Sequence, residues 1–393
     1  MEAWRKIRLG DACKTNANSY SPKEEWDFVN YLDTGNITNN RIDSIQFIDV
    51  RSEKLPSRAR RKVKKDSIIY STVRPNQRHF GIIKSQPEHF LVSTGFAVID
   101  VDANVLDADF LYYLLTQAAL VEALHAIAEQ STSAYPSIKP SDIEDLEIEI
   151  PDLATQKKIA DVLGSMDRRI TQNTGINNNL YAQAKAIFDN HFVNIDAIPA
   201  GWRKGNLLDI ANYLNGLAMQ KFRPQGNEIG LPVLKIKELR QGSCDDSSEL
   251  CSLRIKPEYI IHDGDVIFSW SGSLLVDIWC GGTCGLNQHL FKVTSDIYDK
   301  WFYYLWTAHH LARFIAIAAD KATTMGHIKR EELAKAEVLI PCEEDYTSLT
   351  SIMQPVFELI ISNRIEARKL AALRDELLPK LMSGEIDVSA IQL

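Results

Sequence analysis

A run of polar side chains directly after a predicted strand carries groups that can recognise the edges of nucleic-acid bases. The strand is predicted over residues 67–71, and the candidates that follow it are Arg74, Asn76, Gln77, Arg78 and His79. Arginine can form two hydrogen bonds to guanine O6 and N7, and asparagine or glutamine can do the same with adenine N6 and N7. The alternative, an ordinary polar turn, stays open for each single residue.

Basic residues gather just before that strand. Eight lysines or arginines and one acid lie within residues 51–65. The formal net charge of the chain is −8, which argues against a general nucleic-acid coat, so contacts with a polyanion must come from local patches of this kind. We interpret the core of this run as phosphate contacts, with a solvated surface loop as the alternative. The residues meant are Arg58, Arg60, Arg61 and Lys62.

Equivalent positions in the second half of the chain carry different groups. There the place of the first loop is taken by Trp270, Ser271 and Ser273. Beside it we expect contributions from a second turn and, in both halves, from polar turns before the last strand. These further candidates are Asn287, Gln288, His289, Thr132, Tyr135, Thr324 and His327. For Trp270 a place in the hydrophobic core is the alternative.

Catalytic and metal-binding patterns are missing from the sequence. The six cysteines form no CxxC pair, and Cys280 and Cys284 with His289 fit no standard zinc spacing. There is no GxxxxGK[ST] phosphate loop, and no Asn-Pro-Pro-aromatic tetrapeptide of the kind amino-methyltransferases use. We therefore predict no catalytic residue, no metal ligand and no cofactor in this chain.

The candidate residues are positioned by a scaffold that occurs twice. Setting Pro151 on Pro341 aligns Ile170 with Ile360 at a constant spacing of 190 residues. Near the start of each half, Trp4-Arg5-Lys6 recurs as Trp202-Arg203-Lys204. The halves agree at apolar positions and diverge at polar ones, as expected of two lobes that share a fold and bind different ligands.

Each lobe is followed by a long amphipathic helix, predicted over 151–193 and 346–382. About 40 residues of helix span ~60 Å, and an apolar stripe this narrow needs a partner helix. We expect the two helices to pair as an antiparallel coiled coil with a lobe at either end. The stripe residues, which we also take as partner-binding, are Ile159, Val162, Met166, Ile170, Leu180, Ile352, Val356, Ile360, Leu370 and Leu377. Asn173 and Asn177 in this stripe either set the helix register or face a solvated joint.

Strands and helices alternate without a βαβ rhythm, so the fold class is α+β, with two α/β lobes alternating with the two helices. Within the first lobe we predict one helix over 110–128 and a strand over 138–150. The predicted domains are 1–151 (lobe 1), 152–198 (central helix), 199–341 (lobe 2) and 342–393 (C-terminal helix and tail). No signal peptide or membrane span is visible, and the cysteines are read as free thiols, so we expect a cytoplasmic protein with no membrane partner.

Taken together and in order, the motifs resemble the specificity subunits of Type I restriction–modification enzymes over the whole chain. The motifs are Trp4-Arg5-Lys6, Thr72-Val73-Arg74-Pro75-Asn76, Gln156-Lys157-Lys158-Ile159-Ala160 and Leu377-Leu378-Pro379-Lys380-Leu381-Met382. The resemblance implies that each lobe is a target-recognition domain and that the chain is a non-catalytic, sequence-specific DNA-binding subunit. Its site would be bipartite and asymmetric, with one domain per half-site.

The same resemblance implies the partners. Double-stranded DNA and two modification (methyltransferase) subunits docked on the helices are expected, with restriction subunits bound through them. S-adenosylmethionine, ATP and magnesium would belong to those subunits. Two other classes of function stay open, a protein-binding coiled-coil scaffold and a self-sufficient DNA methyltransferase or nuclease.

Overall fold

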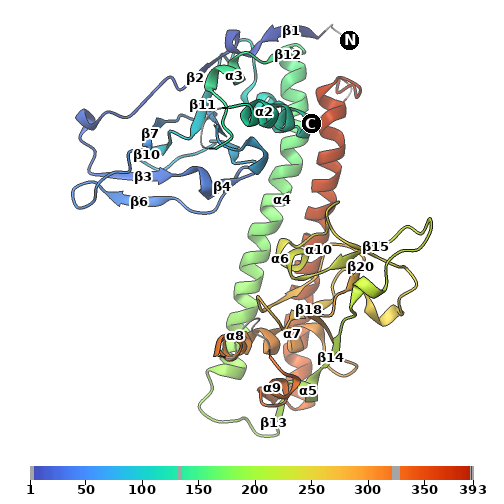
Figure 1. The fold of residues 1–393 in the computed structure, drawn as a ribbon. Coiled ribbons are helices and arrows are strands. Elements are labelled where there is room, and N and C mark those ends of the chain that lie inside the picture. The colour runs from blue at the N-terminus through green and yellow to red at the C-terminus, as the bar shows by residue number, and fades with distance from the viewer. Residues whose placement is uncertain (1–3, 132–134, 321–327, 390, 392–393) are drawn as a thin grey trace. The chain divides into compact units, whose positions relative to one another are not determined.

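The chain folds as two compact units in the computed structural model, which describes residues 4–131, 135–320, 328–389 and 391 (Figure 1). Unit 1 comprises Met1–Asp167 and Ala372–Leu393, and unit 2 comprises Arg168–Ala371. Each unit therefore holds one lobe together with part of both long helices. The division into four domains by residue number stays a prediction.

Lobe 1 contains two four-stranded sheets. The first has the order β2 (Cys13–Thr15), β11 (Phe96–Val101), β8 (Ile68–Ser71) and β9 (Phe80–Ile82). The second has the order β6 (Gln46–Asp49), β3 (Phe28–Leu32), β10 (Phe90–Ser93) and β7 (Ala59–Lys62), in which β10 is parallel to β3 and antiparallel to β7. A short hairpin of β4 (Ile37–Thr38) and β5 (Arg41–Ile42) follows β3, and β1 (Arg5–Arg8) pairs with β12 (Glu147–Ile150).

Lobe 2 repeats the two four-stranded sheets in the same strand order. One sheet has the order β14 (Asn212–Asn215), β21 (Leu290–Thr294), β18 (Val266–Ser269) and β19 (Leu275–Ile278). The other has the order β16 (Leu250–Cys251), β15 (Leu231–Leu234), β20 (Cys284–Leu286) and β17 (Ile260–Ile261), again with one parallel pair, β15 and β20. The pair β13 (Arg203–Asn206) and β22 (Glu337–Ile340) matches β1 and β12. The predicted α+β fold with an internal repeat is thus confirmed.

Two predictions for lobe 1 need correction. The single helix predicted over 110–128 is two helices, α1 (Ala108–Thr116) and α2 (Ala118–Glu129), because Gln117 has an extended backbone with ψ 136°. The strand predicted over 138–150 begins instead with the short helix α3 (Pro140–Glu144), in which a proline occupies the first turn and Asp142 accepts a hydrogen bond from the Lys139 N–H. Only β12 remains as strand.

The helices of lobe 2 are α5 (Leu207–Ile210), α6 (Ile236–Gln241), α7 (Lys300–His309), α8 (Leu311–Asp320) and α9 (Arg330–Ala334), of which α7, α8 and α9 follow the order of α1, α2 and α3. In the described part of the chain, no single helix is long and apolar enough to cross a membrane. The bent pair α1 and α2 passes that test jointly, and its apolar side chains are packed into the core of lobe 1.

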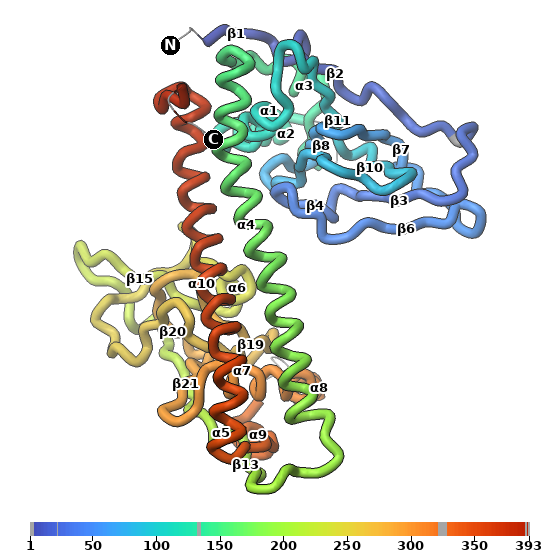
Figure 2. The backbone as a smooth tube through the Cα atoms, turned by 180° about the vertical axis from the view of Figure 1, so that it is seen from behind, coloured from blue at the N-terminus to red at the C-terminus, as the bar shows by residue number. Residues whose placement is uncertain are grey.

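The two long helices are α4 (Leu153–Phe188), which continues as a π-helical turn (Asp189–Val193), and α10 (Glu343–Met382). In unit 2 the Arg169 guanidinium donates to Glu366, and further along α4 the Asn177 amide donates to the carbonyl oxygen of Ile360. Rising residue numbers on α4 therefore meet falling numbers on α10, so the helices run antiparallel, as predicted (Figure 1 and Figure 2). In unit 1, Arg374 of α10 pairs with Asp167 of α4.

The buried stripe of α10 differs from the predicted one at Ile352. Its buried apolar residues include Leu349, Met353, Phe357 and Ile360, whereas Ile352 is 51% exposed. One residue corresponds to a rotation of ~100° about a helix axis, so Ile352 is turned away from the stripe that Met353 belongs to. On α4, Ile159 is buried and Val162, Met166, Ile170 and Leu180 are half-buried, as are Val356, Leu370 and Leu377 on α10. The stripe also includes Leu163, which is fully buried and was not predicted.

The asparagines lie inside the helix pair. Asn173 is buried, and its Nδ2 donates to Glu366 Oε2 over 2.7 Å. The Nδ2 atom of Asn363 donates to Asn177 Oδ1 over 2.9 Å. Buried amides bonded across the interface exclude a solvated joint at Asn173, and they favour a role in fixing the register.

Candidate nucleic-acid interface

The loop after β8 in lobe 1 is a tight turn with a strained backbone at both ends. A 3₁₀ turn (Pro75–Gln77) is flanked by Arg74 with φ 48° and Arg78 with φ 56°, both in the left-handed region. Residues other than glycine rarely adopt this region, and such outliers cluster at functional sites. The turn is closed by the Arg78 N–H, which donates to the Pro75 carbonyl oxygen over 3.0 Å.

Backbone hydrogen bonds join this loop to its neighbours. The Thr94 N–H donates to the carbonyl oxygen of Arg58 over 2.8 Å, and the Thr72 N–H donates to that of Gly95 over 2.8 Å. The Arg74 N–H donates to the carbonyl oxygen of Pro136 over 2.9 Å. The start of the basic strand, the turn after β10, the 72–79 loop and the 135–137 segment thus form one continuous surface. We call it the lobe 1 loop surface.

The candidate side chains on this surface differ in their exposure to solvent. Asn76 and Gln77 are exposed. Arg74 is exposed and its guanidinium lies 5.3 Å from the centre of the Tyr135 ring, a cation–π contact. Arg78 and His79 are half-buried.

His79 Nδ1 lies 2.6 Å from the Ile37 carbonyl oxygen. A carbonyl can only accept, so Nδ1 donates there, and Nε2 of the neutral ring is left as an acceptor. The remaining lobe 1 candidate, Thr132, lies outside the described residues.

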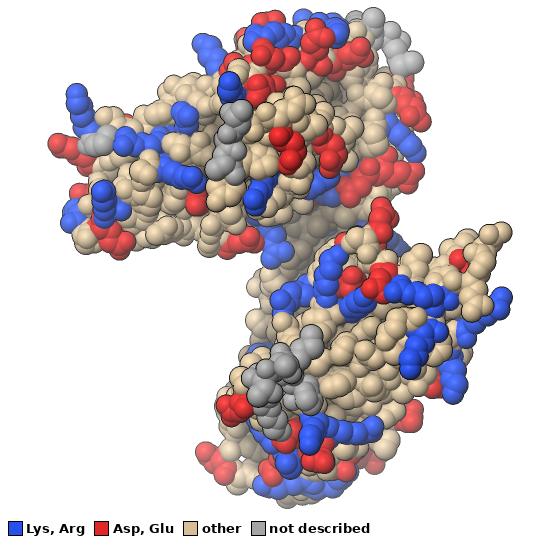
Figure 3. Space-filling view, in the orientation of Figure 1, with Lys and Arg blue, Asp and Glu red and all other residues tan. Residues whose placement is uncertain are grey.

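Charges are mixed over the visible face of each unit, where lysines and arginines are interspersed with acids (Figure 3).

Within the basic run of lobe 1, Arg58 and Arg60 are exposed. Arg61 is half-buried, and burial lowers the pKa of its guanidinium. Arg61 Nε is fully buried and has no hydrogen-bond partner among the described residues. Among the arginines predicted to contact phosphate, the exposed Arg58 and Arg60 are therefore the best placed to do so.

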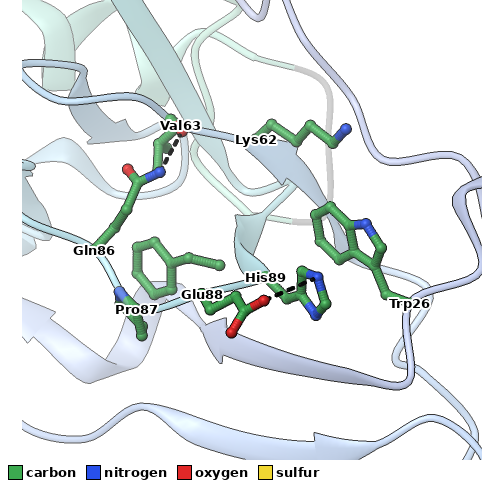
Figure 4. Close-up of a pocket in the computed structure, with 8 residues that line it drawn as sticks. Trp26, Lys62, Val63, Gln86, Pro87, Glu88 and His89 are labelled. Atoms are coloured by element: carbon green, nitrogen blue, oxygen red, sulfur yellow. Dashed lines mark hydrogen bonds and ion pairs between the residues drawn. The ribbon is translucent and has the colours of Figure 1, made fainter.

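Lys62 lies at the other end of β7 from the lobe 1 loop surface. In the β7–β10 pair Ala59 is opposite Ser93 and Lys62 is opposite Leu91. The Lys62 ammonium pairs with Glu24 and lies 5.1 Å from the centre of the Trp26 ring. Figure 4 shows it at the rim of a cavity of about 420 Å³ lined also by His89, which stacks on Trp26. Lys62 thus has protein partners away from the other candidates.

Lobe 2 builds its loop on the same hydrogen bonds. The Ile328 N–H donates to the Trp270 carbonyl oxygen as the Ile138 N–H does to that of Thr72. The Ser269 hydroxyl donates to the Ser271 carbonyl oxygen as the Ser71 hydroxyl does to that of Val73. The two loops therefore share these supporting hydrogen bonds but differ in length, residues 72–79 in lobe 1 and 270–274 in lobe 2, and in side chains.

Several lobe 2 candidates turn out to support the loop from inside. Ser271 is 3% exposed and its hydroxyl lies 2.9 Å from His289 Nδ1, while Asn287 is 6% exposed. Trp270 is half-buried, packs against the core and donates its indole N–H to Asn215 Oδ1 over 2.9 Å. Ser273 is exposed, and Gln288 and His289 are half-buried. Thr324 and His327 lie outside the described residues.

One neighbour of the lobe 1 loop was missed from the sequence. The β4–β5 hairpin packs on the loop, since the Asn39 N–H donates to the carbonyl oxygen of Arg78 over 2.9 Å. Its tip, Asn39-Asn40, is a pair of residues that tolerates positive φ, which is typical of a two-residue hairpin turn. The Asn39-Asn40 dipeptide is therefore a pattern from which a hairpin turn could have been predicted at this place in the sequence.

Comparisons with known proteins agree with this geometry. The family described as Type I restriction modification DNA specificity domain matches residues 1–182 and again 199–373. The Type I restriction enzyme HindI specificity subunit of Haemophilus influenzae is 22% identical over 98% of this chain and 100% of its own length. The MjaIX specificity subunit of Methanocaldococcus jannaschii is 28% identical over 72% of this chain and 70% of its own length.

A solved structure shares the fold. The S subunit of a Type I restriction–modification system from M. genitalium superposes with a TM-score of 0.59 at 15% identity, covering 96% of each chain. The two family matches fall on the two lobes and take in most of the chain. The chain therefore belongs to the Type I restriction–modification DNA specificity family, whose role is the recognition of DNA sequence.

Proposed function

We propose that this chain is the non-catalytic subunit that selects the target of a Type I restriction–modification complex, and that it recognises a bipartite, asymmetric DNA site with one lobe per half-site. The observation that carries the proposal is that two lobes with the same strand order present different loops: Arg74, Asn76, Gln77 and Arg78 in one, Ser273, Gln288 and His289 in the other. Because the two lobes share a scaffold, they dock on the duplex in the same way. Because their loops carry different side chains, they recognise different base sequences in the two half-sites.

The chemistry then belongs to partners. Two modification subunits dock on the paired helices, and restriction subunits join through them. S-adenosylmethionine, ATP and magnesium are bound by those subunits. A native mass spectrum of the chain titrated with its modification subunit should reach two copies of that subunit per chain. Saturation at one copy would contradict the symmetric docking.

Catalytic silence is tested with the purified chain. The chain alone, incubated with target DNA and labelled S-adenosylmethionine, should transfer no methyl group, and with ATP and magnesium it should cut no DNA. The same chain assembled with its modification subunits serves as the control and should methylate one target sequence. Methyl transfer by the chain alone would favour the alternative of a self-sufficient methyltransferase. Failure of the assembled complex to bind DNA would favour a protein scaffold.

A further inference from the structure

The β4–β5 hairpin of lobe 1 is built to stand at the edge of the lobe 1 loop surface. Its two tip residues, Asn39 and Asn40, have φ 47° and 64°, so the turn is one that only a narrow set of residues tolerates. Asn40 Oδ1 accepts the Ile82 N–H over 2.9 Å, and the Asn39 N–H binds the Arg78 carbonyl oxygen. The hairpin is thereby fixed to both the loop and β9.

Glycine at position 81 permits this close approach. A Cβ atom there would lie 2.7 Å from Asn40 Oδ1 and 2.7 Å from Ile37 Cδ1, and 3.3 Å from Asn40 Cα. Distances below 3.0 Å require the neighbour to move, and the backbone of the tip lies close behind. An alanine at 81 therefore requires the Asn40 amide, which accepts the Ile82 N–H, and the Ile37 side chain to move, and this loosens the attachment of the hairpin.

Ile37 of the hairpin is buried, and the residues after it are exposed to solvent. Residues 38–47 are all exposed. The Arg41 side chain is 84% exposed, and its one ion pair among the described residues is loose, with Nε 4.0 Å from Asp43 Oδ1. The hairpin backbone is held in place beside the candidate base-recognising loop, while the side chain of Arg41 is free to move. Its guanidinium can therefore donate two hydrogen bonds to a ligand from a fixed point of attachment.

The corresponding segment differs in lobe 2. Between the equivalent strands β15 and β16 the chain forms the helix α6 in place of a hairpin. It also adjoins its loop, since a Cβ on Gly272 would lie 3.6 Å from Ile236 Cδ1. The repeat thus keeps the strands of its four-stranded sheets and has a different structure at this position in each lobe, next to the loops that differ.

We infer that the β4–β5 hairpin is a second recognition element of lobe 1, which enters the major groove and places the Arg41 guanidinium on a guanine beside the base pairs contacted by the 74–79 loop. The inference rests on the proposed function and extends it to a residue outside that loop. The major groove admits a two-stranded ribbon, and arginine on guanine O6 and N7 is the commonest specific contact there.

The test is methylation of a randomised target library by the assembled complex carrying Arg41→Ala or Arg41→Lys. Both variants should lose about tenfold or more of the preference for guanine at one position of one half-site. Lysine keeps the charge and lacks the planar fork, so the two losses should be similar. A variant Arg41→Lys that keeps the full preference would show a simple charge contact and overturn the inference, as would an unchanged preference in Arg41→Ala.

Three further variants complete the design. Gly81→Ala should reduce the same preference while Arg41 is intact, with the other half-site unchanged as a check of folding. Arg5→Ala, an exposed arginine on β1, is the matched control and should change no preference. Arg78→Ala tests the loop separately: if it relaxes its base pair and Arg41→Ala relaxes none, the hairpin inference fails and the proposed function stands. If Arg41→Ala alone relaxes a position, the hairpin holds and the role of the loop is lost.

Discussion

Arg60 and Arg78 present the same guanidinium group in two settings. Arg60 is exposed on β7, an edge strand, and Arg78 is half-buried at the strained end of the 75–77 turn. A phosphate contact needs charge and reach, whereas a base contact needs a fixed geometry. Exposure suits Arg60 to the first task, and the locked backbone suits Arg78 to the second.

Replacing each arginine should therefore impair DNA recognition in a different way. Arg60→Ala should weaken binding to all DNA sequences alike and reduce the slope of log K against log salt by about one. Arg78→Ala should relax the requirement at one base pair, at a cost of about 1–3 kcal/mol in discrimination. Binding to target and non-target duplexes over a range of salt concentrations measures both effects. A sequence-selective loss in Arg60→Ala would reverse the assignment.

A carboxylate in unit 2 gives a pH-dependent prediction. Arg368 of α10 donates from both terminal nitrogens to Asp263, over 2.7 and 2.8 Å, and the Gly282 N–H donates to the same carboxylate. Burial opposes ionisation of Asp263, but these hydrogen bonds outweigh it, and the pKa of Asp263 is lowered. The pair ties α10 to lobe 2.

Asp263→Asn should reduce the free energy of unfolding by about 2 kcal/mol at pH 7, the scale of hydrogen bonds to a charged group. Because the folded pKa is depressed, the stabilisation is complete above the ordinary aspartate pKa of about 3.9 and is lost as the pH falls through the lower folded value. Urea unfolding of both proteins at pH 7 and at about pH 3 measures the difference. A gap between the two proteins that grows on acidification would contradict this.

Single residues were predictable from sequence where the signal was local. A strand followed by Arg74–Arg78 identified an exposed loop, because strand periodicity and turn residues are short-range patterns. The burial of Ser271 and Asn287 and the pairing of Lys62 with Glu24 were not predictable, because each depends on partners distant in sequence. Polar type alone does not distinguish a side chain that holds a loop from one that meets a ligand.

At the scale of elements, the long helices show what periodicity determines and what it leaves open. Their existence, length and antiparallel direction follow from an apolar stripe that occurs twice. The angular position of the stripe does not, since lobe 2 covers part of α10 and shifts the buried face to Met353 and Phe357. The break at Gln117 is a tertiary effect too, because α1 and α2 both pack into one core.

Ile352 and Ile360 are a matched pair on α10 for testing that face. Ile360 is 7% exposed and Ile352 is 51% exposed, with the same side chain on the same helix. Ile360→Glu should cost about 3 kcal/mol or more, because it buries an unpaired charge, whereas Ile352→Glu should change the free energy of unfolding by less than about 0.5 kcal/mol. Denaturant titration compares the two variants. Equal effects would show that the packing face is assigned incorrectly.

At the scale of the whole molecule, each lobe is organised around its own core. Among the described residues, the cluster of Ile68, Leu111 and Leu163 lies within unit 1, and that of Phe268, Trp301 and Phe357 lies within unit 2. The two lobes have the same strand order in their four-stranded sheets, and the internal repeat in the sequence predicts that they share a scaffold. The target itself is not predictable, because base contacts depend on side-chain geometry and on DNA shape at positions that no residue touches.

Separate cores imply that the lobes can be altered independently. Arg78→Ala should change preferences in one half-site only, and Ser273→Ala, in the exposed loop of lobe 2, in the other only. Effects at independent sites add, so the double variant should show the sum of the two losses to within about 0.5 kcal/mol. The measurement is methylation of a randomised target library by the assembled complex with each single variant and the double variant. If either single variant altered both half-sites, or if the double variant departed clearly from the sum, the lobes would not recognise DNA as separate domains.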